Sequence, residues 1–266
     1  MRDSFGRKIN YLRISVTDRC NLRCRYCMPE NGVPLFSPKT ILSFEEIIEV
    51  ITIAVPLGMT KVRLTGGEPL IRRDIEKLIA LISKVPGIKD FSLTTNGILL
   101  SRYAQVLADA GLQRVNVSLD TVRPERFRMI TRGGELQLVF RGLQAAQKAG
   151  LYPIKLNCVV AKSANEPDAI EVAKFARTNG FEIRFIRIMD AGTGTFSVVD
   201  GGTGGDCPRC NRIRLSADGI VKPCLFSDLG FDVRRLGVAN ALHKAIENKP
   251  ESGGPCKHNW IRAVGG

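Results

Sequence analysis

Cys20, Cys24 and Cys27, which follow a short β-branched run, have the spacing of ligands to a metal centre. Three thiolates are one fewer than a structural zinc site or a four-cysteine iron–sulfur cluster uses. In a four-iron cluster, three ligands keep one iron open, and S-adenosylmethionine (SAM) can chelate that iron through its amino and carboxylate groups. An electron from the cluster can then cleave the sulfonium bond and yield an adenosyl radical. The alternative is a structural zinc loop that recruits a distant fourth cysteine.

A second cysteine group lies in the last quarter of the chain. Cys207 and Cys210 are followed by Arg212 and Arg214, with Cys224 beyond them. The fixed fork of arginine suits phosphate groups, so two arginines beside a metal ligand indicate an anion-binding site. The chain contains no P-loop pattern, and side chains and strand-end loops must therefore bind any phosphate.

The two remaining cysteines have different expected roles. Cys256 could join the second group in a four-thiolate zinc site, which would remove the open position for a ligand. Cys158 lies among apolar residues in a predicted strand and is expected to be a buried apolar side chain. Eight cysteines in a chain without a signal-peptide pattern argue against a disulfide framework.

Polar residues follow three of the predicted strands. The Gly-Gly-Glu-Pro turn at residues 66–69 ends the second strand, and its glycines would let a ligand approach the backbone closely. Thr94 ends the third strand and Ser118 the fourth. Chemistry in α/β folds lies at the carboxyl ends of the strands, so these residues should share one rim with the cysteine loop. Tyr26 could form an aromatic wall for adenine, although a packing role is equally plausible.

Composition limits the class of protein. The net charge of +13 and the isoelectric point near 9.6 call for an acidic partner. Basic residues are scattered along the chain instead of forming a dense stripe, so they suit a solvated surface as well as a nucleic-acid patch. We expect that nucleic acid is not a partner. The most apolar run, residues 47–57, is interrupted by Glu49 and Pro56 and is far shorter than the ~20 residues of a membrane helix. We expect a cytoplasmic protein that does not contact membranes.

Alternating strands and helices must position these groups. Short β-branched runs predict six strands, at residues 12–16, 61–64, 90–94, 114–119, 154–160 and 182–188. Amphipathic stretches predict five helices between them, at residues 44–55, 73–84, 101–110, 136–149 and 168–178. Ser43 and Glu46 form a capping box, and Gly111, Gly150 and Gly180 close three of the helices. Such an order predicts parallel pairing, in an open doubly wound sheet or an incomplete (β/α) barrel.

This order of predicted elements divides the chain into three regions. Residues 1–190 contain the strand–helix units, and residues 191–206 have the glycine-rich texture of a linker. Residues 207–266 contain the second cysteine group and a short helical pattern at residues 239–247, and they end in Gly265 and Gly266.

Together these motifs resemble the radical SAM superfamily. The first cysteine group with Tyr26, the turn at residues 66–69 and the strand-end polar residues carry that resemblance. The second cysteine group with its arginines, the segment at residues 12–20 and the terminal glycines make the chain similar to the GTP 3′,8-cyclases, which perform the first step of molybdenum cofactor biosynthesis. The resemblance covers residues 5–189 almost continuously and resumes at residues 207–227 and at the terminus. It implies an incomplete (β/α)6 barrel with a small C-terminal cluster-binding extension.

The resemblance also implies ligands and residue roles. Two four-iron clusters would lie at opposite ends of a channel, one held by Cys20, Cys24 and Cys27 and the other by Cys207, Cys210 and Cys224. Residues expected to bind SAM are Tyr26, Gly67, Ser118 and Met189. Residues expected to bind GTP are Arg13, Arg63, Thr94, Lys155, Arg212, Ile213 and Arg214. Residues expected to assist catalysis are Arg13, Arg212, Arg214, Gly265 and Gly266.

The implied reaction starts when the adenosyl radical removes the ribose 3′ hydrogen of GTP. The resulting carbon radical attacks C8 of the same guanine and gives (8S)-3′,8-cyclo-7,8-dihydroguanosine 5′-triphosphate. Implied partners are a flavodoxin- or ferredoxin-like electron donor and the next enzyme of the pathway, cyclic pyranopterin monophosphate synthase. A homodimer is a further expectation.

The chain departs from the family before the second cysteine group. Family members usually have a longer stretch there, which helps to cover the barrel opening, whereas here only residues 191–206 span it. The shortening bears on the second cluster more than on the first. Two alternatives stay open: a radical SAM enzyme with an auxiliary cluster that acts on a peptide or another small molecule, and a zinc-bearing protein that binds nucleic acid without catalysis.

Overall fold

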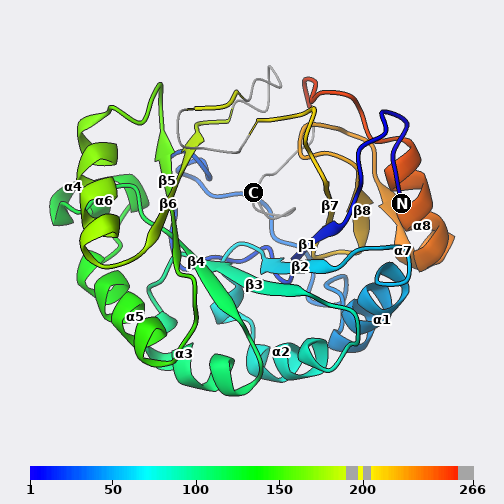
Figure 1. Cartoon of the computed structure of the whole chain (residues 1–266), viewed down its shortest axis with the longest axis horizontal. Helices are drawn as coiled ribbons and strands as arrows, with labels where there is room; N and C mark the ends of the chain where they lie inside the picture. The colour runs from blue at the N-terminus through cyan, green and yellow to red at the C-terminus, as the bar shows by residue number, and fades with distance from the viewer. Residues whose placement is uncertain (190–196, 200–204, 257–266) are drawn as a thin grey trace.

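Six parallel strands form the frame of the molecule in a computed structural model, which describes residues 1–189, 197–199 and 205–256. The strands are β1 (Tyr11–Ser15), β2 (Lys61–Thr65), β3 (Asp90–Thr95), β4 (Arg114–Ser118), β5 (Lys155–Val160) and β6 (Glu182–Arg187). They pair in chain order from β1 to β6. Figure 1 shows that the sheet curves and that the helices lie along its outer side only. This arrangement confirms the incomplete barrel and excludes the open doubly wound sheet.

The predicted helices are all present. They are α1 (Phe44–Ala54), α2 (Ile75–Ser83), α3 (Leu100–Asp109), α5 (Leu136–Lys148) and α6 (Pro167–Thr178). The capping box is confirmed, because the Ser43 side chain accepts a hydrogen bond from the Glu46 N–H and the Glu46 carboxylate accepts one from the Ser43 N–H. The sequence analysis missed α4 (Pro124–Thr131) and the short 3-10 helix η1 (Pro69–Ile71), each of which begins with proline.

The two faces of the sheet differ in polarity. Leu12, Ile14, Val62 and Leu64 belong to the core between the sheet and the outer helices, and all four are at most 1% exposed. Alternate residues of the same strands point inward and are mostly polar or basic. Parallel strands buried on both faces usually read as continuous apolar runs, so this alternation indicates a barrel interior built to hold a polar ligand.

The C-terminal segment extends the same sheet. β7 (Arg212–Leu215) pairs in parallel with β1, and β8 (Ile220–Lys222) and β9 (Phe231–Asp232) follow as antiparallel strands. None of these three strands was predicted, because each is short. The helix predicted at residues 239–247 is α8 (Val238–Glu247), preceded by the short α7 (Val233–Leu236). β7 thus places the second cysteine group beside the first strand of the barrel.

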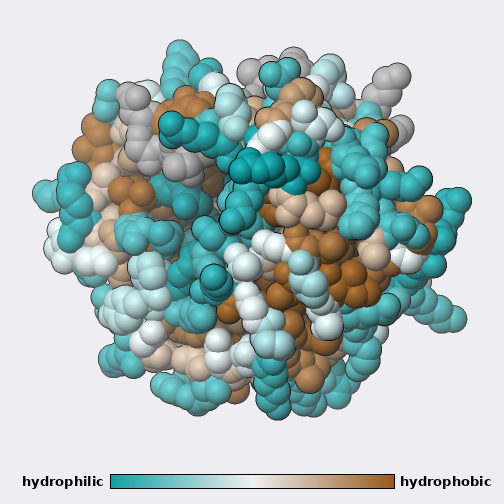
Figure 2. Space-filling view, turned by 45° about the vertical axis from the view of Figure 1, so that its right-hand side comes forward, coloured by the Kyte–Doolittle hydropathy of each residue, from teal (hydrophilic) through white to brown (hydrophobic). Residues whose placement is uncertain are grey.

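No helix among the described residues is long and apolar enough to cross a membrane. Figure 2 shows hydrophilic residues over much of one face of the molecule, with apolar residues between them. Most of the predicted linker lies outside the described residues, and so do Gly265 and Gly266.

Candidate active site

Two cavities open inside the barrel and share part of their walls. The first, here called the cysteine-loop cavity, measures about 1030 Å³ and is lined by Cys20, Cys24 and Cys27. The second, the arginine cavity, measures about 1080 Å³ and is lined by the second cysteine group and by arginines. Both volumes include the open mouths. Asn157, Ile186 and Met189 line both cavities, so the two cavities adjoin each other.

The cysteine-loop cavity gathers the residues that were predicted to bind SAM. Its lining includes Tyr26, Gly67, Ser118 and Met189, and also Thr94, which was predicted to bind GTP. These residues come from five separate segments of the chain. The parallel register of β2, β3 and β4 brings their ends to one rim, as the sequence predicted.

Gly67 packs against the cysteine loop. Its N–H donates to the Thr17 carbonyl at 2.7 Å, and the Glu68 N–H donates to the Arg19 carbonyl at 2.8 Å. A Cβ on Gly67 would lie 2.0 Å from the Arg19 carbonyl oxygen. Glycine is therefore required so that the turn after β2 can support the backbone just before Cys20.

Glu68 is buried, with 1% of its surface exposed, and joins the ends of two strands. Its carboxylate accepts hydrogen bonds from the Thr95 hydroxyl at 2.7 Å, the Asn96 N–H at 2.7 Å and the Leu70 N–H at 3.0 Å. Burial raises the pKa of Glu68 to about 7, even though these three bonds favour the charged form. The group fixes the loop after β3 against the turn after β2.

Tyr26 is oriented by Asp120, a contact that the sequence analysis did not predict. The Tyr26 hydroxyl donates to the Asp120 carboxylate at 2.7 Å, and the Val159 N–H donates to the same carboxylate at 2.8 Å. Burial raises the pKa of Asp120 to about 6. The phenol is thus tied to β5, and Tyr26 lies between Cys24 and Cys27 in the sequence.

A row of arginines forms one wall of the arginine cavity. Arg13 on β1 lies in register with Arg63 on β2 and with Arg214 on β7, so the three guanidinium groups extend from neighbouring strands on the same face. Adjacent strands are about 4.8 Å apart. Arg212 and Arg184 also line this cavity. The sequence analysis did not predict Arg184, because this residue lies within β6 and belongs to no recognisable motif.

The buried positive charges of these arginines repel one another. Burial, followed by the charge of Arg214, holds the pKa of Arg13 well below its usual range. Burial and the charge of Arg212 lower the pKa of Arg214 to about 10. Asp206 is the one carboxylate among the residues that line this cavity. A ligand with several negative charges would relieve this repulsion.

Two buried oxygens in the cavity walls lack hydrogen-bond partners among the described residues. They belong to the Thr94 hydroxyl and the Asn157 side-chain amide. Thr94 lines the cysteine-loop cavity, and Asn157 lines both cavities. Buried polar groups are rarely unpaired, so these oxygens suit a polar ligand in the cavities.

Two residues predicted to bind GTP lie outside the cavity linings. Lys155 forms an ion pair with Glu182 on the neighbouring strand. Ile213 is fully buried in the core on the outer side of the sheet, because it alternates with Arg212 and Arg214. The Ile213 side chain therefore faces away from the cavity that its two neighbours line.

The cysteines of the two groups lie around the two cavities. Among the residues that the structure describes, no three His, Cys, Asp or Glu side chains are placed to hold one metal ion. Cys256 packs with Leu225 and Phe226 in a cluster that also contacts Cys224, and it does not line the arginine cavity. Cys20, Cys24 and Cys27 line one cavity, and Cys207, Cys210 and Cys224 line the other, so each group could hold a metal centre with an open position.

The sequence model of the radical SAM superfamily matches residues 14–176. The fold and the first cysteine group agree with that match, and the chain belongs to this superfamily. Within it, the chain is 40% identical to a GTP 3′,8-cyclase of Moorella thermoacetica, across 97% of this chain and 95% of the relative. It is 39% identical to a GTP 3′,8-cyclase of Listeria monocytogenes, across 95% and 91%. The chain belongs to the family of these cyclases.

The alignment with the Moorella relative spans 307 positions, which exceeds the 266 residues of this chain. The relative therefore has residues that this chain lacks. Solved structures support the fold alone. A SAM-bound structure named anSMEcpe aligns with a TM-score of 0.63 at 18% identity, over 96% of this chain and 83% of that one. SuiB from Streptococcus suis, bound to its precursor peptide, aligns with a TM-score of 0.56 at 20% identity, over 70% and 40%.

Proposed function

We propose that this chain is a radical SAM GTP 3′,8-cyclase that carries out the first step of molybdenum cofactor biosynthesis. The observation that carries the proposal is the pair of adjoining cavities, in which a cavity lined by a row of arginines lies next to a cavity lined by three cysteines. A triphosphate would supply negative charge that balances the positive charge of these arginines. The relatives to which the chain is about 40% identical are named GTP 3′,8-cyclases.

Cys20, Cys24 and Cys27 would hold the first four-iron cluster, whose open iron binds SAM. When bound, this pair supplies the adenosyl radical that removes hydrogen from C3′ of GTP. The chain orients SAM through Tyr26, Gly67, Ser118 and Met189, all of which line the cysteine-loop cavity. Asp120 holds the Tyr26 phenol in place. Asn157, Ile186 and Met189, which line both cavities, would lie between bound SAM and the nucleotide.

Arg13, Arg63, Arg212 and Arg214 would bind the triphosphate, each through charge-assisted hydrogen bonds. The Thr94 hydroxyl has no partner within the described residues and is assigned to the nucleotide. Lys155 and Ile213 complete the set carried over from the family. Lys155 would have to exchange Glu182 for the nucleotide, and Ile213 can contribute only backbone atoms to the cavity side.

Cys207, Cys210 and Cys224 would hold a second four-iron cluster whose open position faces the guanine. Burial raises the pKa of the Cys210 thiol, but the charges of Lys249 and Arg212 outweigh it and lower this pKa to about 7. A thiol that ionises near neutral pH is prepared for iron. C3′ bonds to C8 once the 3′ hydrogen has left, and one electron and one proton complete the dihydroguanine ring.

The remaining assignments follow the family. Gly265 and Gly266 would enter the active site and assist catalysis with Arg13, Arg212 and Arg214. A flavodoxin- or ferredoxin-like protein would donate electrons in the cytoplasm, and cyclic pyranopterin monophosphate synthase would receive the product. A homodimer is the proposed assembly.

The deciding experiment is anaerobic reconstitution followed by incubation with SAM, dithionite and GTP. We expect about eight irons per chain, two distinct EPR signals with one altered by GTP, and equal amounts of 5′-deoxyadenosine and cyclised nucleotide. GDP and ATP serve as matched substrates that lack one phosphate or the guanine. Cleavage of SAM without a cyclised product would overturn the cyclase proposal and favour action on a peptide or another small molecule.

A further inference from the structure

Lys249 is a buried lysine whose partners are backbone carbonyls. It follows α8, is 2% exposed and lines the arginine cavity. Its ammonium donates to the Arg212 carbonyl at 2.9 Å and to the Pro223 carbonyl at 2.8 Å. Burying a lysine is costly because its ammonium loses water, so buried lysines are almost always paired with hydrogen-bond acceptors.

The two carbonyls flank ligands of the second cysteine group. Arg212 lies two residues after Cys210, and Pro223 directly precedes Cys224. The start of β7 and the turn after β8, which the pairing of β7 with β8 already brings together, are therefore also bridged by one ammonium group.

Arg7 holds the remaining ligand of the group. Its guanidinium donates to the Cys207 carbonyl at 2.8 Å, to the Glu251 carbonyl at 2.8 Å and to the Pro250 carbonyl at 2.6 Å. Asp3 fixes the same guanidinium at 2.6 Å. The N-terminal segment also meets the end of α8, where the Ser4 hydroxyl donates to the Glu247 carbonyl at 2.9 Å.

We propose that Lys249 and Arg7 form a clamp that positions the three cysteines of the second group and supplies a buried positive charge beside their thiolates. Charge-assisted hydrogen bonds are stronger than neutral ones, so two cations can hold three loops together. Both residues lie outside residues 190–206. The clamp therefore explains how the second cysteine group stays positioned in a chain that is shorter than its relatives. This inference rests on the proposed second cluster.

Hydrogen exchange on the chain without clusters tests the clamp directly. Lys249→Met should speed amide exchange tenfold or more at residues 207–212 and 223–226, while exchange in β2 to β5 stays unchanged. Lys249→Arg should restore slow exchange, because its fork can also reach both carbonyls. Lys244→Met, at an exposed position on α8, is the matched control. Equal exchange in the wild-type and Lys249→Met chains would overturn the proposal.

Reconstituted protein provides the second readout. In Lys249→Met the second EPR signal should weaken and the iron content fall toward four per chain, while the first signal is retained. Any second cluster that does form should have a more negative reduction potential, because a nearby positive charge has been removed. An unchanged potential together with full iron content would contradict the clamp.

Arg7→Met guards against a Lys249 variant that does not fold. We expect faster exchange around Cys207 and residues 250–251, with the turn at Pro223 unaffected. A wild-type chain that lacks GTP turnover but shows the same pattern of exchange would sink the cyclase proposal and leave the clamp standing. Uniformly fast exchange in every variant would reject the clamp.

Discussion

The two cysteine groups line adjoining cavities but differ in the charges that surround them. Around the first group, burial raises the pKa of Cys20 to about 11 and that of Cys24 to about 12, with further increases from Glu68 and Asp120 respectively. Near the second group, Lys249 and Arg212 overcome burial and lower the pKa of Cys210 to about 7. Identical ligand types therefore meet opposite electrostatic environments.

This difference matches the ligands proposed for each side. SAM brings its own positive sulfonium to the first group, where buried carboxylates are close by. The triphosphate is anionic, and arginines surround the cavity that it would occupy. Arg212, which is proposed to bind the nucleotide, also favours the thiolate form of Cys210. One set of charges thus serves both the substrate and the metal centre.

Removing one cysteine from each group gives the largest expected effect. Cys24→Ala should reduce 5′-deoxyadenosine formation to background, because the first cluster supplies the electron for SAM cleavage. Cys210→Ala should abolish the cyclised product but retain slow SAM cleavage. Chromatography of both products measures the difference.

Cys158→Ala is the matched control, because Cys158 is buried and lines neither cavity. It should keep both activities. The contrast between the two groups would break down if Cys24→Ala still cleaved SAM, or if Cys210→Ala still cyclised GTP.

Glu68 tests the acidic side of the comparison through pH. Its pKa is about 7 in the folded chain and near 4.5 when unfolded, so folding takes up a proton between these values. The unfolding free energy of the cluster-free chain should therefore fall as pH rises from 4.5 to 7, by up to about 3 kcal/mol from this group. Glu68→Gln should remove this part of the slope in urea unfolding followed by circular dichroism. An identical slope in both chains would show that Glu68 ionises normally.

Much of the frame could be predicted from the sequence, because period-2 and period-3.6 patterns are local. β3 begins at Asp90 as predicted, and α5 begins at Leu136. The residues of β7 were recognised only as part of the second cysteine motif and not as a strand. Four residues carry little periodicity, and the parallel partner β1 lies about two hundred residues away in the chain. Arg184 and Asn157 were missed for a related reason: only the register of the barrel brings them to the cavities.

Arg214 tests the cationic side. Arg214→Met removes one charged donor from the row and should lower kcat/KM for GTP about 10- to 150-fold, the equivalent of 1.5–3 kcal/mol. Arg214→Lys keeps the charge without the fork and should lose about tenfold. SAM binding, measured separately by calorimetry, should change little in both variants.

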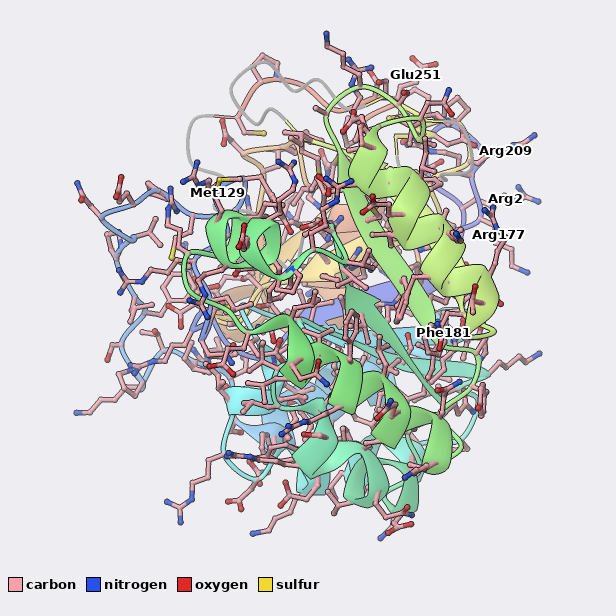
Figure 3. All side chains as sticks on the ribbon, turned by 90° about the vertical axis from the view of Figure 1, so that its left-hand side faces the viewer. Arg2, Met129, Arg177, Phe181, Arg209 and Glu251 are labelled. Atoms are coloured by element: carbon pink, nitrogen blue, oxygen red, sulfur yellow. The ribbon has the colours of Figure 1, made fainter. Side chains whose placement is uncertain are left out.

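Arg177→Met is the matched control for the loss of a surface arginine. Arg177 lies on α6, and Figure 3 shows it at the outside of the molecule. It should leave kcat/KM unchanged. An equal loss in SAM affinity and in GTP turnover in Arg214→Met would mean that the two cavities are not divided as described.

Thr94, which lines the cysteine-loop cavity, gives the smallest expected effect. Its hydroxyl is buried and has no hydrogen-bond partner within the described residues, so Thr94→Val removes a polar atom without breaking a bond in the unliganded chain. The unfolding free energy should stay within about 1 kcal/mol of wild type or rise slightly. The KM for GTP should rise two- to tenfold, which corresponds to the loss of one neutral hydrogen bond of about 0.5–1.5 kcal/mol. Thr95→Val is the matched variant, because the Thr95 hydroxyl donates to Glu68, and it should lose stability instead. A Thr94→Val chain that is destabilised but keeps its KM would place this hydroxyl in the framework and not in the site.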